Sequence, residues 1–208
     1  MKNGGTFGMF SVPMYSGEVK NSRKINRELL SLCEELEFDH MDGWISNTQK
    51  LNQNAFDSSI VDRAPLFREA LNVHLKQYLD DVGTLDIQIG DSSSRQYMIK
   101  NSWITQTTKN QFAHLHSHGD SDISGVYYIK TTGKDGNIYF HSPLEMLACN
   151  YIMGSLDSAF EIPAQQGYII LWPSFLLHGV RENTTDSKRL SLSFNLNFVR
   201  SGFTLREY

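Results

Sequence analysis

In the segment Gly167-Tyr168-Ile169-Ile170-Leu171-Trp172-Pro173-Ser174-Phe175-Leu176-Leu177-His178, an apolar run is followed by a proline-marked bend and by a second apolar run that ends in an imidazole. Short apolar runs bounded by turn residues are typical of buried strands, and proline is confined to the ends, edges or bulges of strands. The segment therefore predicts two buried strands, with His178 at the end of the second strand.

Two more histidines, His116 and His118, lie earlier in the chain, just before the strand-like stretch 123–129. Side chains two positions apart on an extended segment point the same way, so both imidazoles, together with that of His114, share one face. A sheet can bring this face next to His178, and neutral imidazole suits Fe, Zn, Cu and Ni. We therefore predict a metal site at His116, His118 and His178. The alternatives are a solvated histidine-rich turn and a hydrogen-bonded core histidine.

An alternating run of apolar and polar residues begins at Arg189 and continues to Phe198. Period-two alternation gathers the polar residues on one face, namely Arg189, Ser191, Ser193 and Asn195. If the apolar face packs against a helix layer, this polar face lines an interior cavity. A buried guanidinium is costly when unpaired and its planar fork suits a carboxylate, so Arg189 predicts that the cavity binds an acid. The alternative is an exposed arginine on an edge strand.

These motifs resemble those of the Fe(II)- and 2-oxoglutarate-dependent oxygenases, and within them a group of bacterial and phage proteins. The pattern of that group is approximately H-x-H, S-G-x-Y-Y, G-x-x-x-x-x-P-S-x-x-x-H and R-x-S-x-S-F-N. This chain matches it at His116 to His118, Ser124 to Tyr128, Gly167 to His178 and Arg189 to Asn195. The resemblance is strong over about residues 100–199 and is weaker upstream, where 10–13 and 43–47 carry it.

The resemblance implies a mainly β fold, a double-stranded β-helix of the jelly-roll or cupin-like type, buttressed by N-terminal α-helices. It implies three ligands for iron and three residues around the distal carboxylate of 2-oxoglutarate: His116, His118 and His178 for iron, and Arg189, Ser191 and Tyr128 for the carboxylate. The implied enzyme is a dioxygenase that couples decarboxylation of 2-oxoglutarate, to succinate and carbon dioxide, with hydroxylation of an unactivated C–H bond. Its substrate is then a small molecule or, by family analogy, a peptidyl residue such as proline.

One position departs from the superfamily, where the second metal ligand is usually Asp or Glu in an H-x-D motif and here is His118. Three neutral imidazoles leave the metal's charge uncompensated, although bound 2-oxoglutarate carries two negative charges that restore neutrality. Imidazole does not favour Fe(II) over Zn, Ni or Cu, so the pattern leaves the metal open. His118-Gly119-Asp120 is itself an H-x-D motif, and a site in which Asp120 or Asp122 replaces His118 as ligand, or one built from His118, Asp120 and His178, is the alternative.

Two other classes of protein fit part of the pattern. A cupin-type metalloenzyme has the same barrel and a motif of H-x-H, a following acid, G-x-x-x-x-x-P and a third histidine, which Asp122, Gly167, Pro173 and His178 match in part. A jelly-roll metal-binding module is the non-enzymatic alternative. Arg189 favours the oxygenase over the cupin, whereas a fourth protein ligand would favour structural zinc, which is usually four-coordinate.

The length of 208 residues predicts one domain with a large core. The net charge is −4 and there is no Lys/Arg cluster, so we expect no nucleic-acid partner. Cys33 and Cys149 form no C-x-x-C motif and are expected to be reduced thiols. The N-terminus lacks a signal-peptide pattern, and the longest apolar run, near 168–177, is too short for a membrane span. We therefore expect a soluble cytoplasmic protein.

We expect residues 1–95 to form a helical support and lid region, and residues 96–200 to form the double-stranded β-helix. Apolar residues at helical spacing predict two helices, the first from Ile25, Leu29, Leu32 and Leu36, and the second from Phe67, Leu71, His74, Leu75 and Tyr78. Asp62 is the expected cap of the second helix, with Pro65 in its first turn and Gly83 at its end.

Three further segments carry expectations about loops. Residues 39–57 are polar and predict a loop whose Trp44 is a candidate for the substrate entrance, with core packing as the alternative. Residues 131–136 predict a hairpin-type turn, followed by a strand that ends near His141, before Pro143. His141 is more often structural at such a position than in contact with substrate. Residues 144–158 are expected to form a longer connection that borders the substrate mouth.

Overall fold

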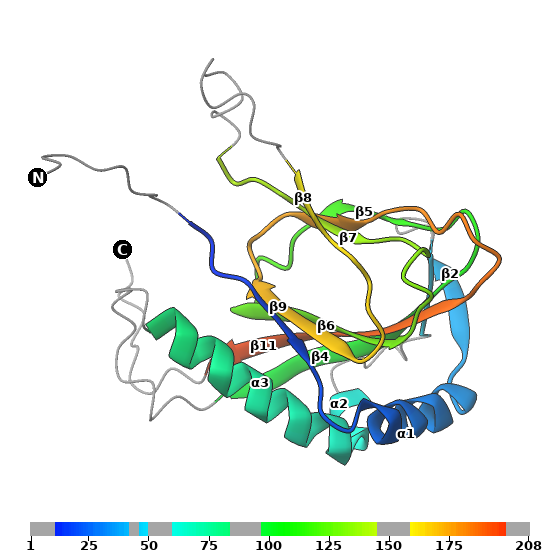
Figure 1. Ribbon diagram of the computed structural model, residues 1–208, viewed down its shortest axis with the longest axis horizontal. Helices are drawn as coiled ribbons and strands as arrows, with labels where there is room; N and C mark the ends of the chain where they lie inside the picture. Colours follow the sequence, from blue (N-terminus) through cyan, green and yellow to red (C-terminus); the bar gives the residue numbers. More distant parts are fainter. Residues whose placement is uncertain (1–10, 42–45, 50–59, 84–96, 145–158, 199–208) are drawn as a thin grey trace, which may run out of the picture.

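The computed structural model describes residues 11–41, 46–49, 60–83, 97–144 and 159–198. In this part of the chain two antiparallel sheets face each other, and helices cover the outer face of the larger sheet (Figure 1). The larger sheet has the order β1 (Tyr15–Glu18), β9 (Tyr168–Pro173), β6 (Ile123–Lys130), β11 (Arg189–Phe198), β4 (Tyr97–Thr107), β3 (Ser46–Gln49) and β2 (Phe38–Met41). The smaller sheet has the order β5 (Ala113–His116), β10 (His178–Val180), β7 (Ile138–His141) and β8 (Ala159–Ile162). The predicted mainly β jelly-roll with flanking helices is confirmed.

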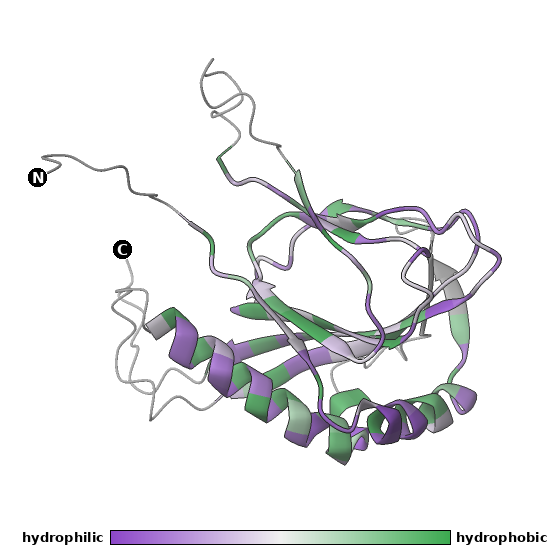
Figure 2. Ribbon diagram, viewed as in Figure 1, coloured by the Kyte–Doolittle hydropathy of each residue, from purple (hydrophilic) through white to green (hydrophobic). Residues whose placement is uncertain are grey.

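The helices are α1 (Ser22–Glu34), α2 (Ile60–Arg63) and α3 (Pro65–Gly83). Both predicted helices are present, and α3 ends at Gly83 as expected. Their apolar side faces the larger sheet and their polar side faces outward (Figure 2), and in this layer the rings of Phe67 and Tyr127 lie 5.1 Å apart between centroids. Among the described residues, none of the helices combines the length and the apolarity needed to cross a lipid bilayer.

The N-terminus of α3 is capped from another helix, which corrects the expectation that Asp62 caps it. The backbone N–H groups of Leu66 and Phe67 each donate to the Glu28 carboxylate of α1, both at 3.1 Å. Asp62 instead belongs to α2 and forms an ion pair with Arg68 at 3.2 Å. The first N–H groups of a helix lack partners within the helix and attract negative charge, so a carboxylate from a packed neighbour serves as well as a local one.

The expectation that residues 39–57 form one loop was wrong in part. β2 ends within this range and β3 lies wholly within it, and β3 pairs with β4 at the edge of the larger sheet. Pairing with an existing sheet edge outweighs polar composition, because strand preference depends on context more than on the residues themselves. Residues before position 96 therefore supply three strands as well as helices. Trp44 lies outside the described residues, as do 50–59 and most of the 144–158 connection.

β11 has the predicted two-sided pattern. Its apolar residues pack into the core beneath the helices, and they are Leu190, Leu192, Phe194 and Leu196. Arg189, Ser191 and Ser193 face the other way and line a cavity between the two sheets. β11 lies between β4 and β6, so neighbours on both sides fix its register and with it the direction of every polar side chain.

The second predicted strand of the 167–178 segment is a turn. β9 forms as expected, but the chain then turns, with the N–H of Leu176 donating to the carbonyl of Pro173 at 3.0 Å, and His178 begins β10 rather than ending a strand. The carbonyl of Ser174 accepts from the N–H of His118 at 2.9 Å. The turn is therefore tied to the segment that carries the earlier histidines.

Residues 131–136 turn the chain but do not form a hairpin. They join β6 in the larger sheet to β7 in the smaller sheet, and the two strands do not pair. The carboxylate of Asp135 organises the turn, because it accepts from the hydroxyl of Thr131 at 2.5 Å and from the N–H of Thr132 at 2.8 Å. The prediction of a hairpin was wrong because a turn signal in a sequence does not say which sheet the next strand enters.

Candidate metal centre

Three histidines lie close together in the cavity between the two sheets. His116 ends β5 and lies opposite His178 of β10 in the strand pairing, and His118 follows two residues after β5. The ring centroids are 4.3 Å apart for His116 and His178, 5.1 Å for His116 and His118, and 5.2 Å for His118 and His178. One nitrogen from each ring lies within 4.8 Å of the other two, so the three could hold one metal ion.

All three imidazoles donate a hydrogen bond from Nδ1. The acceptors are the carbonyl of His114 for His116 at 2.7 Å, the carbonyl of Leu176 for His178 at 3.0 Å, and Oδ1 of Asn195 for His118 at 2.8 Å. A neutral imidazole that donates from Nδ1 carries its lone pair on Nε2. The cluster is therefore built from three Nε2 lone pairs, which is the form that binds metals.

Burial keeps these imidazoles neutral. It lowers the pKa of His178 to about 3 and the pKa of His116 to about 4, and neighbouring imidazoles lower both further because positive charges repel: His118 acts on His116, and His116 and His118 act on His178. Burial also lowers the pKa of His118. At neutral pH the site therefore offers uncharged nitrogen donors without first losing protons.

The two acids that were the alternative ligands lie elsewhere. Asp120 is exposed and forms an ion pair with Lys100. The carboxylate of Asp122 accepts from the N–H of Phe198 at 2.8 Å, at the end of β11. Within the described part of the chain, no Asp, Glu, Cys or fourth His joins the three histidines. A structural zinc site usually has four protein ligands, and the described residues supply three here.

Arg189 is only 3% exposed. Its Nη1 donates to the carbonyl of Gly136 at 2.6 Å and its Nη2 donates to the hydroxyl of Thr107 at 3.0 Å. The buried Nε has no hydrogen-bond partner among the described residues, and no ion pair to Arg189 occurs there. A buried guanidinium with an unused donor and only neutral acceptors is suited to an incoming carboxylate.

Tyr128 and Ser191 lie opposite each other in the pairing of β6 with β11, and both line the cavity with Arg189. Burial raises the pKa of the Tyr128 phenol to about 12, so its hydroxyl keeps its proton at neutral pH. Two hydroxyl groups and a guanidinium therefore converge on the same part of the cavity. Both hydroxyls can donate to an anion held there.

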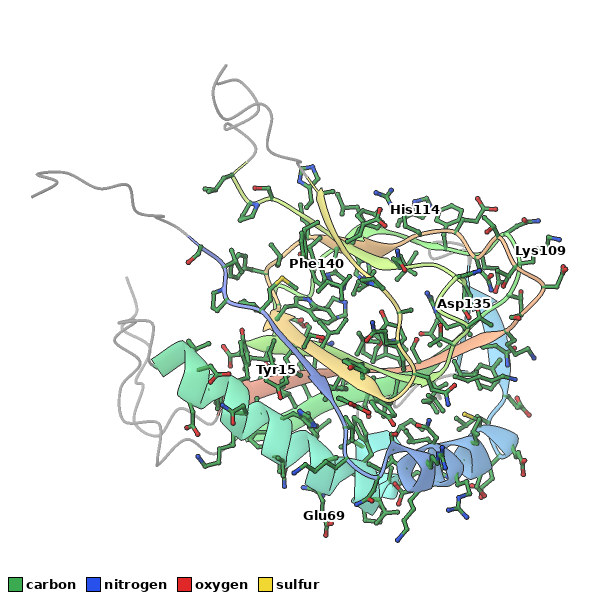
Figure 3. All side chains as sticks on the ribbon, in the orientation of Figure 1. Tyr15, Glu69, Lys109, His114, Asp135 and Phe140 are labelled. Atoms are coloured by element: carbon green, nitrogen blue, oxygen red, sulfur yellow. The ribbon has the colours of Figure 1, made fainter. Side chains whose placement is uncertain are left out.

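One cavity of about 270 Å³ contains both groups, the three histidines and Arg189. Aromatic side chains line it as well, and they are Trp103, Phe112 and Trp172. Figure 3 shows Phe140 between the two sheets and His114 on the outer side of the smaller sheet. The ring centroids of Phe140 and His178 are 5.9 Å apart. His141 is not among the residues that line the cavity, and His74 is hydrogen-bonded to Tyr15 on the helical side at 2.7 Å.

Sequence reasoning missed one residue of this site and placed another wrongly. Thr107 was not singled out, because its contact with Arg189 follows from the register of β4 with β11, where the two residues are paired. Asn195 was expected in the cavity wall with Ser191 and Ser193, but it contacts His118 instead. The signal for Asn195 was present in the alternation of β11, but its partner could not be read from the sequence.

Comparison with known proteins agrees with this geometry. Residues 101–195 match a family model described as "Putative 2OG-Fe(II) oxygenase". No curated protein matches the sequence. Solved structures match over most of the chain. HygX from Streptomyces hygroscopicus, with nickel, 2-oxoglutarate and hygromycin B bound, matches with a TM-score of 0.58. A 2OG-Fe(II) oxygenase family oxidoreductase from Burkholderia pseudomallei matches with a TM-score of 0.62, and a prolyl-4-hydroxylase from Pseudomonas putida with 0.54.

These three structures share only the fold with this chain, since their identities are 14%, 13% and 15%. The matches cover 93%, 89% and 92% of this chain and 85%, 84% and 95% of the respective structures. The match over residues 101–195 and the shared fold indicate resemblance to the 2OG-Fe(II) oxygenases, enzymes whose cofactors are Fe(II) and 2-oxoglutarate.

Proposed function

We propose that this chain is a 2-oxoglutarate-dependent hydroxylase in which His116, His118 and His178 hold Fe(II) and Arg189 binds the distal carboxylate of 2-oxoglutarate. The observation that carries the proposal is that two binding features lie in one cavity. Three neutral imidazoles present Nε2 lone pairs at one place, and a buried guanidinium with an unused Nε lies at another. A short dicarboxylic acid with a metal-chelating end can bind the metal at one end and Arg189 at the other.

2-Oxoglutarate also offsets most of the positive charge. The three imidazoles add no negative charge to a divalent metal, whereas 2-oxoglutarate brings one negative charge at its chelating end and one at its far carboxylate, beside Arg189. The guanidinium of Arg189 fixes the far carboxylate, and the hydroxyls of Ser191 and Tyr128 donate to it. Bound Fe(II) with 2-oxoglutarate supplies the activation of dioxygen and its coupling to decarboxylation. The protein's own contribution is to orient both ends of the keto acid and to keep water from its far carboxylate.

The substrate that we propose is a small molecule or a peptidyl residue. Both kinds occur among proteins with this fold, since one solved relative holds hygromycin B and another is named a prolyl-4-hydroxylase. Hydroxylation as the outcome and the cytoplasm as the location stay predictions from the sequence. The only cysteine that the structure describes, Cys33, is a free thiol.

The test is an anaerobic titration of the metal-free protein with Fe(II) and then 2-oxoglutarate, followed by visible absorption. We expect the weak metal-to-ligand charge-transfer band that chelation of iron by the keto acid produces. Arg189→Ala should raise the 2-oxoglutarate concentration needed for the band by roughly 30-fold or more, because a charge-assisted bidentate pair contributes about 2–5 kcal/mol. Arg181→Ala is the control, because Arg181 pairs with the exposed Glu161 at 2.6 Å.

Three results would contradict the proposal. Metal uptake without any charge-transfer band in the unmodified protein would mean that the keto acid does not chelate this metal. An unchanged 2-oxoglutarate requirement in Arg189→Ala would mean that the distal carboxylate binds elsewhere. Stoichiometric metal in His178→Ala would exclude His178 as a ligand.

A further inference from the structure

We propose that Asn195 is a positioning residue for the metal centre, and that its side-chain oxygen is what allows a histidine to stand at position 118. The inference rests on the proposed function, in which His118 is a metal ligand. It concerns how the protein prepares that ligand, and the contacts of the three histidines differ in a way that points to it.

His116 and His178 are oriented by their own strands. Each donates from Nδ1 to the backbone carbonyl two residues earlier, that of His114 and that of Leu176 respectively. These acceptors are present whatever side chains the neighbouring residues carry. Substitutions nearby therefore leave the orientation of these two rings intact, as long as the backbone keeps its course.

His118 has no such backbone acceptor and depends on a side chain from another strand. Its Nδ1 donates to Oδ1 of Asn195 in β11, at 2.8 Å. Its backbone is anchored separately, through the N–H that donates to the carbonyl of Ser174 at 2.9 Å. Trp103 stacks on the ring with an interplanar angle of 19°. The stacking limits tilt but does not choose which nitrogen carries the proton, so that choice falls to Asn195.

The amide of Asn195 is itself held in one orientation. Its Nδ2 donates to Oδ1 of Asn101 across the β4–β11 pair at 2.8 Å, and its Oδ1 also lies 2.7 Å from the hydroxyl of Ser124. Asn195 is only 4% exposed, so water does not compete for these bonds. If the amide rotated by half a turn, its NH2 group would face His118 and the Ser124 hydroxyl. Its Oδ1 would then face Oδ1 of Asn101, and two acceptors cannot bond to each other.

The consequence is a fixed tautomer. With Oδ1 as acceptor, the proton of His118 stays on Nδ1 and the lone pair stays on Nε2, which is buried and has no hydrogen-bond partner among the described residues. A carboxylate at this position, as in the usual H-x-D motif, needs no such selection, because either oxygen can bind metal. A histidine at position 118 must keep its proton on Nδ1 to bind metal through Nε2, and the Asn101–Asn195 pair holds it in that form.

The experiment measures binding of Co(II) alone, by competition with a chelator, together with the visible spectrum of the Co(II) protein. Asn195→Leu should weaken Co(II) binding about 10- to 100-fold, the usual effect of losing such an outer hydrogen bond, and should alter the spectrum. Asn195→Asp keeps an oxygen acceptor and should retain binding within a few-fold of the unmodified protein. Asn72→Leu is the matched control, since Asn72 is an exposed residue of α3 whose side chain bonds only to Tyr97.

A second measurement does not depend on any variant's folding. Long-range 1H–15N NMR of the metal-free protein should show His118 protonated on Nδ1, and Asn101→Ala, which frees the amide to rotate, should shift it toward the other tautomer. A proton on Nε2 in the unmodified protein would overturn the inference. Unchanged Co(II) affinity and spectrum in a folded Asn195→Leu protein would overturn it as well.

These outcomes are distinct from failure of the proposed function. If the unmodified protein binds no Co(II), or if His118→Ala binds it as tightly as the unmodified protein, the metal assignment itself is wrong and the role of Asn195 falls with it. If His118→Ala loses Co(II) and Asn195→Leu does not, the metal assignment stands and only the role of Asn195 is overturned.

Discussion

Nη1 of Arg189 lies 2.6 Å from the carbonyl oxygen of Gly136, so the backbone that joins the two sheets holds the guanidinium. The same segment contains Asp135, whose buried carboxylate is occupied by Thr131 and Thr132 and does not pair with Arg189. Figure 3 shows Asp135 at the end of the space between the sheets. The hydrogen bonds that hold the arginine therefore come from neutral acceptors, its Nε is left for a ligand, and the nearby Asp135 carboxylate stabilises its charge.

Gly136→Ala should weaken 2-oxoglutarate binding and lower stability. Gly136 has φ near 100°, and a Cβ there would lie 2.2 Å from the carbonyl oxygen of Arg181 and 3.2 Å from Nη1 of Arg189. The backbone must move, and the guanidinium moves with it. We expect a loss of about 2 kcal/mol or more in the free energy of unfolding, measured by urea denaturation, with a weaker charge-transfer titration.

Gly133→Ala is the control for this change. Gly133 also has positive φ, near 75°, but the nearest atom to its Cβ would be 3.5 Å away. Its cost should be limited to the backbone conformation, about 1–2 kcal/mol, with 2-oxoglutarate binding retained. Equal losses of binding in the two variants would mean that Gly136 does not act through Arg189.

Thr107→Val should weaken 2-oxoglutarate binding by roughly tenfold and leave metal binding unchanged. The change keeps the shape of the side chain but removes the hydroxyl that accepts from Nη2 of Arg189, and a hydrogen bond to a charged group contributes about 1.5–3 kcal/mol. The measurement is the 2-oxoglutarate titration of the Fe(II) protein. Thr105→Val alters the next cavity-lining threonine of β4 without touching that bond, and a similar loss there would contradict the explanation.

The metal-free protein should lose stability as the pH falls below about 6.5. The pKa of His178 is lowered to about 3 and that of His116 to about 4 in the folded state, against about 6.5 when unfolded. Below pH 6.5 the unfolded chain therefore binds more protons, so the contribution is complete above 6.5 and declines as the pH falls toward 3. For the buried His178 alone the slope is about 1.4 kcal/mol per pH unit.

Urea denaturation of the chelator-treated protein between pH 7 and pH 4 measures this decline. His178→Phe replaces the imidazole with an apolar ring of similar shape and should flatten the pH dependence over that range. An unchanged slope in this variant would show that His178 does not contribute to the acid sensitivity.

Glu28→Ala should lower the free energy of unfolding by about 1 kcal/mol, because Leu66 and Phe67 at the start of α3 lose their acceptor. Thermal denaturation should show a midpoint lower by about 2–4 °C. Glu69→Ala removes an exposed carboxylate of the same helix, labelled in Figure 3 on the outer side, and should leave the midpoint nearly unchanged. Equal shifts would indicate a general charge effect instead of a cap.

Some elements could be predicted from the sequence alone, because their pattern involves only residues that are close in the chain. The alternation of β11, the helical spacing of α1 and α3, and Gly83 at a helix end depend only on residues near each other in the chain. The spacing of His116 and His118 also placed both on one face, and the polar face of β11 put Arg189 and Ser191 toward an interior. The class of fold and the roles of Ser191 and Tyr128 came from the resemblance to a known family and not from these patterns.

Contacts between residues that are far apart in the sequence could be identified only in the tertiary structure. Strand register pairs Thr107 with Arg189, helix packing brings Glu28 to the start of α3, and the β4–β11 pair orients Asn195 toward His118. Polar residues 46–49 became a strand because a sheet edge was available to them. A hydrogen bond between residues far apart leaves no periodic trace in one sequence, because its geometry depends on how whole elements pack.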